Sequence, residues 1–146
     1  MVNQYVVDIA RVIQLAVAPV FLLAGIGAML AVLTGRLNRI VDRGRVLEKE
    51  MLAASDARKD EIIADFKRLA CRARWISRAI MLASSSGLIV CLLIVSLFVG
   101  DVFTIGLSRL ISLLFVLAML SFSGAFVYFL REILYATARL RIGPNS

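Results

Sequence analysis

The sequence predicts an all-α membrane protein with three transmembrane helices and a cytoplasmic helical hairpin between the first and the second. Three observations support this fold class. Of the 146 residues 61% are hydrophobic and the mean hydropathy is +0.91, three long stretches carry no charge, and most basic residues lie in one segment. A soluble domain is about half apolar, and a chain of this length buries only part of its surface in one core.

The uncharged stretches have the length of membrane spans. Residues 12–34, 79–100 and 109–130 are the predicted transmembrane helices, the last beginning with Arg109 at the outer interface. A helix rising 1.5 Å per residue needs about 20 apolar residues to cross the hydrocarbon layer. Lipid offers the backbone no hydrogen-bond partners, so each span is expected to be helical.

The basic residues predict the orientation. Residues 35–78 hold 12 of the 17 Lys and Arg residues, and residues 131–146 form a shorter basic tail. Loops rich in Lys and Arg stay in the cytoplasm, so we expect the N-terminus outside and the C-terminus inside. The expected location of this single domain, 1–146, is the bacterial cytoplasmic (inner) membrane. Gly143 and Pro144 are typical of a helix end, so the third helix is expected to reach about Ile142.

Residues 35–78 are predicted to fold as a basic helical hairpin, because apolar residues recur there at alternating steps of four and three. The first series is Leu33, Leu37, Ile40, Gly44, Leu47 and Met51, and the second is Ile62, Phe66, Leu69, Ala73, Ile76 and Ile80. These series favour a coiled-coil-like pairing, either within one chain or between subunits. The short turn at 53–57 favours the former. Gly44 costs about 1 kcal/mol relative to alanine, which is tolerable if another backbone approaches it closely.

Part of the sequence resembles a known family. From Ile13 the chain reads IQLAVAPVFLLAGIGAMLAVLTGRLNRIVDRGR, in which APVFLLAGIGAML and TGRLNRIVDRGR are the most distinctive segments. This string resembles the bacterial domain of unknown function 2721 family of small integral membrane proteins, with looser similarity through the second and third spans. The resemblance implies a membrane location and a helical architecture, and it supplies neither an activity nor catalytic residues.

Polar residues at the inner end of the first span form a candidate site for lipid or partner contact. Its members are Arg36, Asn38, Arg39, Asp42, Arg43 and Arg45. Steps of three and four place three of the arginines on one helical face. They either anchor the span or contact anionic lipid or a partner protein. Asn38 and Asp42 either balance the neighbouring charges or form a polar ring at the mouth of an oligomeric pore.

Small residues in the first span form a second candidate surface, for helix packing. They are Ala24, Gly27, Ala28, Ala31 and Gly35. Such spacing lets helices approach closely in lipid, either within the three-helix unit or between subunits. Ser84, Ser85 and Ser86 open the second span and either hydrogen-bond a neighbouring helix or line a pore.

The composition argues against several classes of function. With no His and two Cys, the chain has neither a four-ligand Cys/His zinc site nor a Ser–His or Cys–His catalytic pair. The apolar stretches hold no Asp, Glu, Lys or His, the residues on which a proton relay depends. Nucleic acid is not an expected partner despite the net charge of +7, because seven acids share the basic segment.

The sequence therefore predicts a non-enzymatic scaffold or accessory subunit whose cytoplasmic hairpin binds a partner or its own copies. The alternative is an oligomeric channel for ions or small solutes. Membrane lipids are expected partners, together with either further copies of the chain or another membrane protein. No catalytic residue, metal or cofactor is expected.

Overall fold

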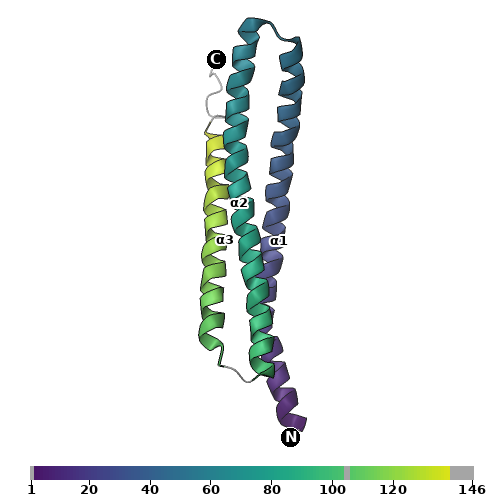
Figure 1. The fold of residues 1–146 in the computed structure, drawn as a ribbon, viewed down its shortest axis with the longest axis vertical. Coiled ribbons are helices and arrows are strands. Elements are labelled where there is room, and N and C mark those ends of the chain that lie inside the picture. The colour runs from purple at the N-terminus through teal and green to yellow at the C-terminus, as the bar shows by residue number, and fades with distance from the viewer. Residues whose placement is uncertain (1, 104–105, 139–146) are drawn as a thin grey trace, which may run out of the picture. The chain divides into compact units, whose positions relative to one another are not determined.

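The computed structural model describes residues 2–103 and 106–138, which form three helices (Figure 1). The helices are α1 (Val2–Ala53), α2 (Asp56–Val102) and α3 (Ser108–Thr137). Each is long and apolar enough to cross a membrane. The all-helical class and the three potential spans are thus confirmed. The predicted extension of the third helix over 139–142 lies outside the described residues.

The connection between α1 and α2 is short. Only residues 54 and 55 are non-helical, so the turn is tighter than the expected 53–57. The backbone amides of Arg58 and Lys59 donate to the Ser55 carbonyl at 3.0 and 3.1 Å, which makes Ser55 the N-cap residue of α2. Asp56 follows in the first turn, where a negative charge suits the helix dipole.

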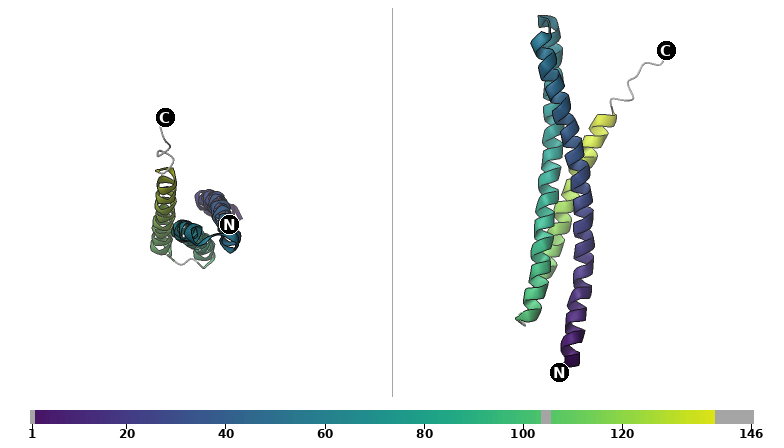
Figure 2. Two further views of the ribbon diagram at one scale, coloured as in Figure 1. Left: turned by 90° about the horizontal axis from the view of Figure 1, so that it is seen from above. Right: turned by 90° about the vertical axis from the view of Figure 1, so that its right-hand side faces the viewer.

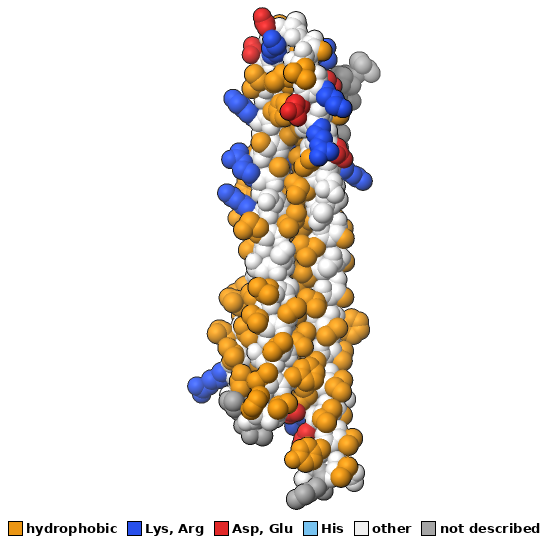
Figure 3. Space-filling model, turned by 45° about the vertical axis from the view of Figure 1, so that its right-hand side comes forward, with side chains coloured by type: hydrophobic (Ala, Val, Ile, Leu, Met, Phe, Trp, Pro, Cys, Tyr) orange, Lys and Arg blue, Asp and Glu red, His pale blue; other side chains and the backbone are white. Residues whose placement is uncertain are grey.

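The described residues divide into two compact units, and each helix contributes to both. The first, which we call the apolar unit, lies within Met1–Leu30 and Leu82–Ser123. The second, the charged unit, lies within Ala31–Met81 and Gly124–Ser146. Figure 3 shows mostly hydrophobic side chains over the apolar unit, whereas most Lys, Arg, Asp and Glu side chains on that face belong to the charged unit.

The core of the apolar unit includes a cluster to which each helix contributes a buried side chain: Ile26 of α1, Val90 of α2 and Ala118 of α3. Partly buried apolar side chains pack against these three: Leu22, Leu23, Leu30, Ile89, Ile94 and Phe122. The unit's outward-facing apolar side chains are largely uncovered, and Phe21 is 74% exposed. Such a surface is unfavourable in water and suits a lipid environment.

The core of the charged unit follows the two predicted apolar series. All twelve positions are buried or half-buried, and the buried ones are Leu33, Ile40, Leu47, Ile62 and Ile76. The C-terminal part of α1 and the N-terminal part of α2 lie side by side here (Figures 1 and 2). No described atom lies within 4 Å of a Cβ built on Gly44, so the close backbone approach considered for this glycine is not seen in the described part of the chain.

Candidate functional site

A buried carboxylate joins the three helices of the charged unit. The Glu132 side chain on α3 has no exposed surface. One of its oxygens accepts a hydrogen bond from Arg36 of α1 at 2.5 Å. The other accepts two from Arg72 of α2, from Nη2 at 2.8 Å and from Nε at 3.3 Å. A buried charge is costly without partners. The triad therefore favours packing of α1 and α2 against α3 that keeps both arginines beside Glu132.

Aromatic side chains lie beside several arginines of the charged unit, Arg36 among them. The Arg36 guanidinium lies 5.2 Å from the centre of the Phe129 ring, within the range of a cation–π contact. The centres of the Trp75 and Tyr128 rings lie 5.5 Å apart. The guanidinium groups of Arg78 and Arg131 lie 5.9 and 5.8 Å from the centre of the Trp75 ring. Arg36 is therefore held by both a carboxylate and a ring, so its guanidinium is oriented in advance.

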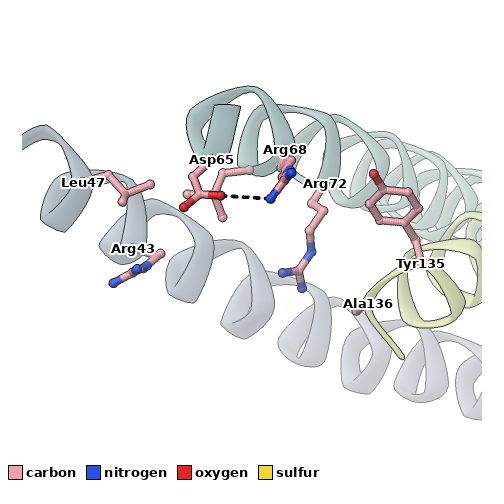
Figure 4. A pocket seen from close by; sticks show the side chains of 8 residues that line it. Arg43, Leu47, Asp65, Arg68, Arg72, Tyr135 and Ala136 are labelled. Carbon is pink, nitrogen blue, oxygen red and sulfur yellow. Dashed lines mark hydrogen bonds and ion pairs between the residues drawn. The ribbon is translucent and has the colours of Figure 1, made fainter. Parts of the chain in front are cut away.

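Two neighbouring pockets open beside this triad. The first has a volume of about 340 Å³, and we call it the arginine pocket; it is lined by Arg36, Arg39, Ile40, Arg43, Leu69, Arg72 and Ala136. The second, of about 280 Å³, shares Arg43, Leu69, Arg72 and Ala136 with the first and adds Leu47, Asp65, Arg68 and Tyr135. Figure 4 shows this second pocket, with Arg43 on α1, Arg68 and Arg72 on α2, and Tyr135 on α3.

The lining of these pockets carries an excess of positive charge. Asp65 pairs with Arg68 at 3.2 Å, and Glu132 pairs with Arg36 and Arg72. Arg39 and Arg43 take part in no ion pair within the described residues. Five guanidinium groups against two carboxylates leave three positive charges in excess. Chemically, the site can bind an anion.

The six residues predicted for lipid or partner contact fall into two groups in the structure. Arg36, Arg39 and Arg43 line the arginine pocket, and Arg36 is half-buried. The other three predicted residues, Asn38, Asp42 and Arg45, are exposed and line neither pocket. Asp42 forms no ion pair with any described residue.

The predicted small-residue surface is open within one chain. Ala24, Gly27, Ala28, Ala31 and Gly35 are all exposed. A Cβ built on Gly27 or Gly35 meets no described atom within 4 Å. The close contact instead involves Gly87 of α2, where a built Cβ lies 3.6 Å from Ile26 Cγ2. Packing of α1 in the apolar unit therefore uses a different face from the predicted one.

The serines of the apolar unit connect α2 to α3. The Ser86 hydroxyl, which is buried, donates to the Ala118 carbonyl at 2.8 Å, and the Ser121 hydroxyl donates to the Leu82 carbonyl at 2.9 Å. Ser84 and Ser85 are exposed. Of the three serines considered for a pore, Ser86 thus forms a bond between helices.

Glu132 and Arg72 were not among the predicted site residues, although the sequence carries a signal for Glu132. Glu132 lies two residues beyond the third apolar run, which ends at Leu130, and Arg36 lies two residues beyond the first, which ends at Thr34. If both ends lie on one side of the membrane, the two side chains are at matching depth. Arg72 had no such signal, because it is one of 12 basic residues in its segment.

Comparison with known proteins identifies one family. The sequence model described as "Protein of unknown function (DUF2721)" matches residues 16–142. This match confirms the resemblance noted from the sequence. No curated protein and no solved structure matched the chain. Within residues 2–103 and 106–138, no group of three His, Cys, Asp or Glu side chains is placed to hold a metal ion.

Proposed function

The chain belongs to the DUF2721 family of proteins of unknown function, and on that premise we propose that it is a non-enzymatic scaffold or accessory subunit of the bacterial inner membrane. Three helices anchor it in the bilayer. The hairpin formed by the end of α1 and the start of α2 lies in the cytoplasm, where it binds a partner protein or further copies of the chain.

The charged unit carries this proposal. Its apolar series is buried or half-buried, whereas most of its charged side chains are exposed. A pair of helices that covers its own apolar face and displays charge beyond the apolar runs is suited to recognition by another protein. The basic residues favour the cytoplasmic side for this unit, because Lys and Arg near membrane spans are retained there.

Thiol labelling tests the orientation. Cys71 and Cys91 are first replaced by serine and alanine, and single Ser55→Cys and Gly106→Cys variants are made; both sites are exposed. A membrane-impermeant thiol reagent added to intact cells should label the Gly106→Cys variant alone. Labelling of the Ser55→Cys variant in intact cells contradicts the proposed orientation.

Partner recovery tests the function. Replacing residues 45–67 by a short Gly/Ser linker should leave membrane insertion intact and abolish recovery of bound protein after extraction in native lipid discs. A gentler variant reverses three exposed charges, Lys49→Glu, Arg58→Glu and Lys67→Glu, and keeps the apolar series. It should also lose recovery. Partner and copy numbers unchanged in both variants contradict hairpin-mediated binding.

Reconstitution separates the scaffold from the channel. The purified protein in liposomes should pass no ions, since the scaffold proposal requires no pore. An ion flux that scales with the amount of protein, together with an oligomer of defined size, would replace the scaffold proposal by the channel.

A further inference from the structure

The arginine pocket has the properties of a ligand site that the scaffold proposal does not use. We propose that it binds a phosphate group, carried either by an anionic lipid headgroup or by a small soluble phosphate compound. Its charge, its geometry and its depth along the helices each support this proposal.

The charge of the pocket favours an anionic occupant. Glu132 offsets Arg36 and Arg72 in part, whereas Arg39 and Arg43 have no carboxylate partner among the described residues. Like charges gathered around one pocket repel, and an anion between them relieves this repulsion. The neighbouring carboxylate, Asp65, pairs with Arg68 at 3.2 Å and lines only the second pocket.

The geometry favours phosphate in particular. Guanidinium groups have planar donor forks that match phosphate oxygens, and each carries five N–H donors. Arg36 donates to Glu132 through Nη1 alone, and Arg72 through Nε and Nη2, so both retain further N–H groups. Their side chains are still 36% and 33% exposed. They are therefore oriented by Glu132 and remain accessible to a ligand.

The depth of the pocket suits a ligand at the membrane surface. Arg36 lies two residues beyond the first apolar run and Arg43 nine residues beyond it, which is about 3 to 14 Å along a helix. The headgroup layer is about 5 to 7.5 Å thick on each side of the hydrocarbon, so the Arg36 end of the pocket lies within it and the Arg43 end lies beyond it. Ile40, Leu69 and Ala136 add apolar surface to the pocket. Both a lipid headgroup and a soluble phosphate can reach this level.

Binding is tested on the full chain in a phosphate-free maltoside detergent. One arm adds phosphatidylglycerol, with diacylglycerol of the same chains as the matched lipid lacking phosphate, and the other adds inorganic phosphate or pyrophosphate. Affinity is measured by titration, and the unfolding temperature with and without each probe. If phosphatidylglycerol binds and neither inorganic phosphate nor pyrophosphate does, the lipid headgroup is the source of the phosphate group. If phosphate or pyrophosphate binds and competes with the lipid, the source is a soluble compound.

The variants separate the pocket from general charge attraction. Arg39→Gln combined with Arg43→Gln removes the two unpaired arginines and should weaken binding about thirtyfold. The matched control, Arg45→Gln with Arg74→Gln, removes the same charge from exposed residues outside both pockets and should weaken binding less than about threefold. Arg43→Lys keeps the charge without the fork and should give an intermediate loss.

The proposal is overturned by equal losses in the two double variants, by equal stabilisation with diacylglycerol, or by the absence of binding to every probe. Neither double variant should lower the unfolding temperature of the ligand-free protein, and the pocket variant should raise it if its arginines repel one another. If the pocket variant does not fold, Arg43→Lys compared with Arg45→Lys gives the same test. All residues that line the arginine pocket lie outside the deleted segment 45–67, so failure of the scaffold proposal leaves this one testable.

Discussion

The apolar unit and the charged unit are built from the same three helices and are held together by different interactions. In the apolar unit, contacts between small and apolar side chains are supplemented by serine hydroxyls that donate to backbone carbonyls, as Ser86 does to Ala118. In the charged unit, a full negative charge is buried and shared by two arginines. Helices in lipid gain little from burying apolar surface, which suits the hydroxyl bonds of the apolar unit. Long arginine side chains near a membrane surface can keep part of their length in water, which suits the ion pairs of the charged unit.

The largest expected effect comes from removing both partners of Glu132. Arg36→Met with Arg72→Met leaves a buried carboxylate unpaired and should lower the free energy of unfolding by about 3 to 5 kcal/mol. Adding Glu132→Met should recover most of that loss, because an apolar core replaces the charges. Unfolding in mixed detergent micelles measures both. A triple variant as unstable as the double would show that burial of the charge is not the cause.

A smaller loss is expected in the apolar unit. Ser86→Ala removes the hydroxyl that bonds the Ala118 carbonyl and should cost about 1 kcal/mol in the same unfolding assay. Ser112→Ala is the matched control, since this exposed hydroxyl bonds the Ser108 carbonyl of its own helix. Equal losses in the two variants would mean that the bond between helices adds nothing.

Gly44→Ala in the charged unit should raise the free energy of unfolding by about 0.5 to 1 kcal/mol, because alanine restricts the unfolded chain and has open space here. The unfolding assay is run together with a measurement of oligomer mass. A loss of stability, or of a higher oligomer, would instead indicate that a second copy approaches this glycine.

The smallest effect is expected on the exposed small-residue face of the apolar unit. Ala28→Leu should change the free energy of unfolding by less than about 0.5 kcal/mol, because Ala28 is exposed in the single chain. Ala118→Leu, at a buried position, provides the contrast and should be strongly destabilising. A large effect at Ala28 would indicate that this face of α1 contacts another subunit.

The regular features of the fold could be predicted from the sequence. Uncharged length predicted the three potential spans, and the apolar steps of four and three predicted positions such as Leu47 and Ile62, which are buried. The candidate site was predicted only in part. Arg36, Arg39 and Arg43 were placed on one face, but their pocket depends on Arg72 and Ala136. No local pattern marks residues that come together from three helices.

The buried Glu132 carboxylate also has a consequence for how the chain enters the bilayer. Until the segments bearing Arg36 and Arg72 are in place, that carboxylate lacks both of its ion-pair partners and must stay hydrated. If α3 crossed a membrane in the reverse direction, Glu132 would lie on the opposite side from Arg36 and Arg72. In a bilayer the triad would therefore favour the direction of insertion of α3 that brings Glu132 to the side of Arg36 and Arg72.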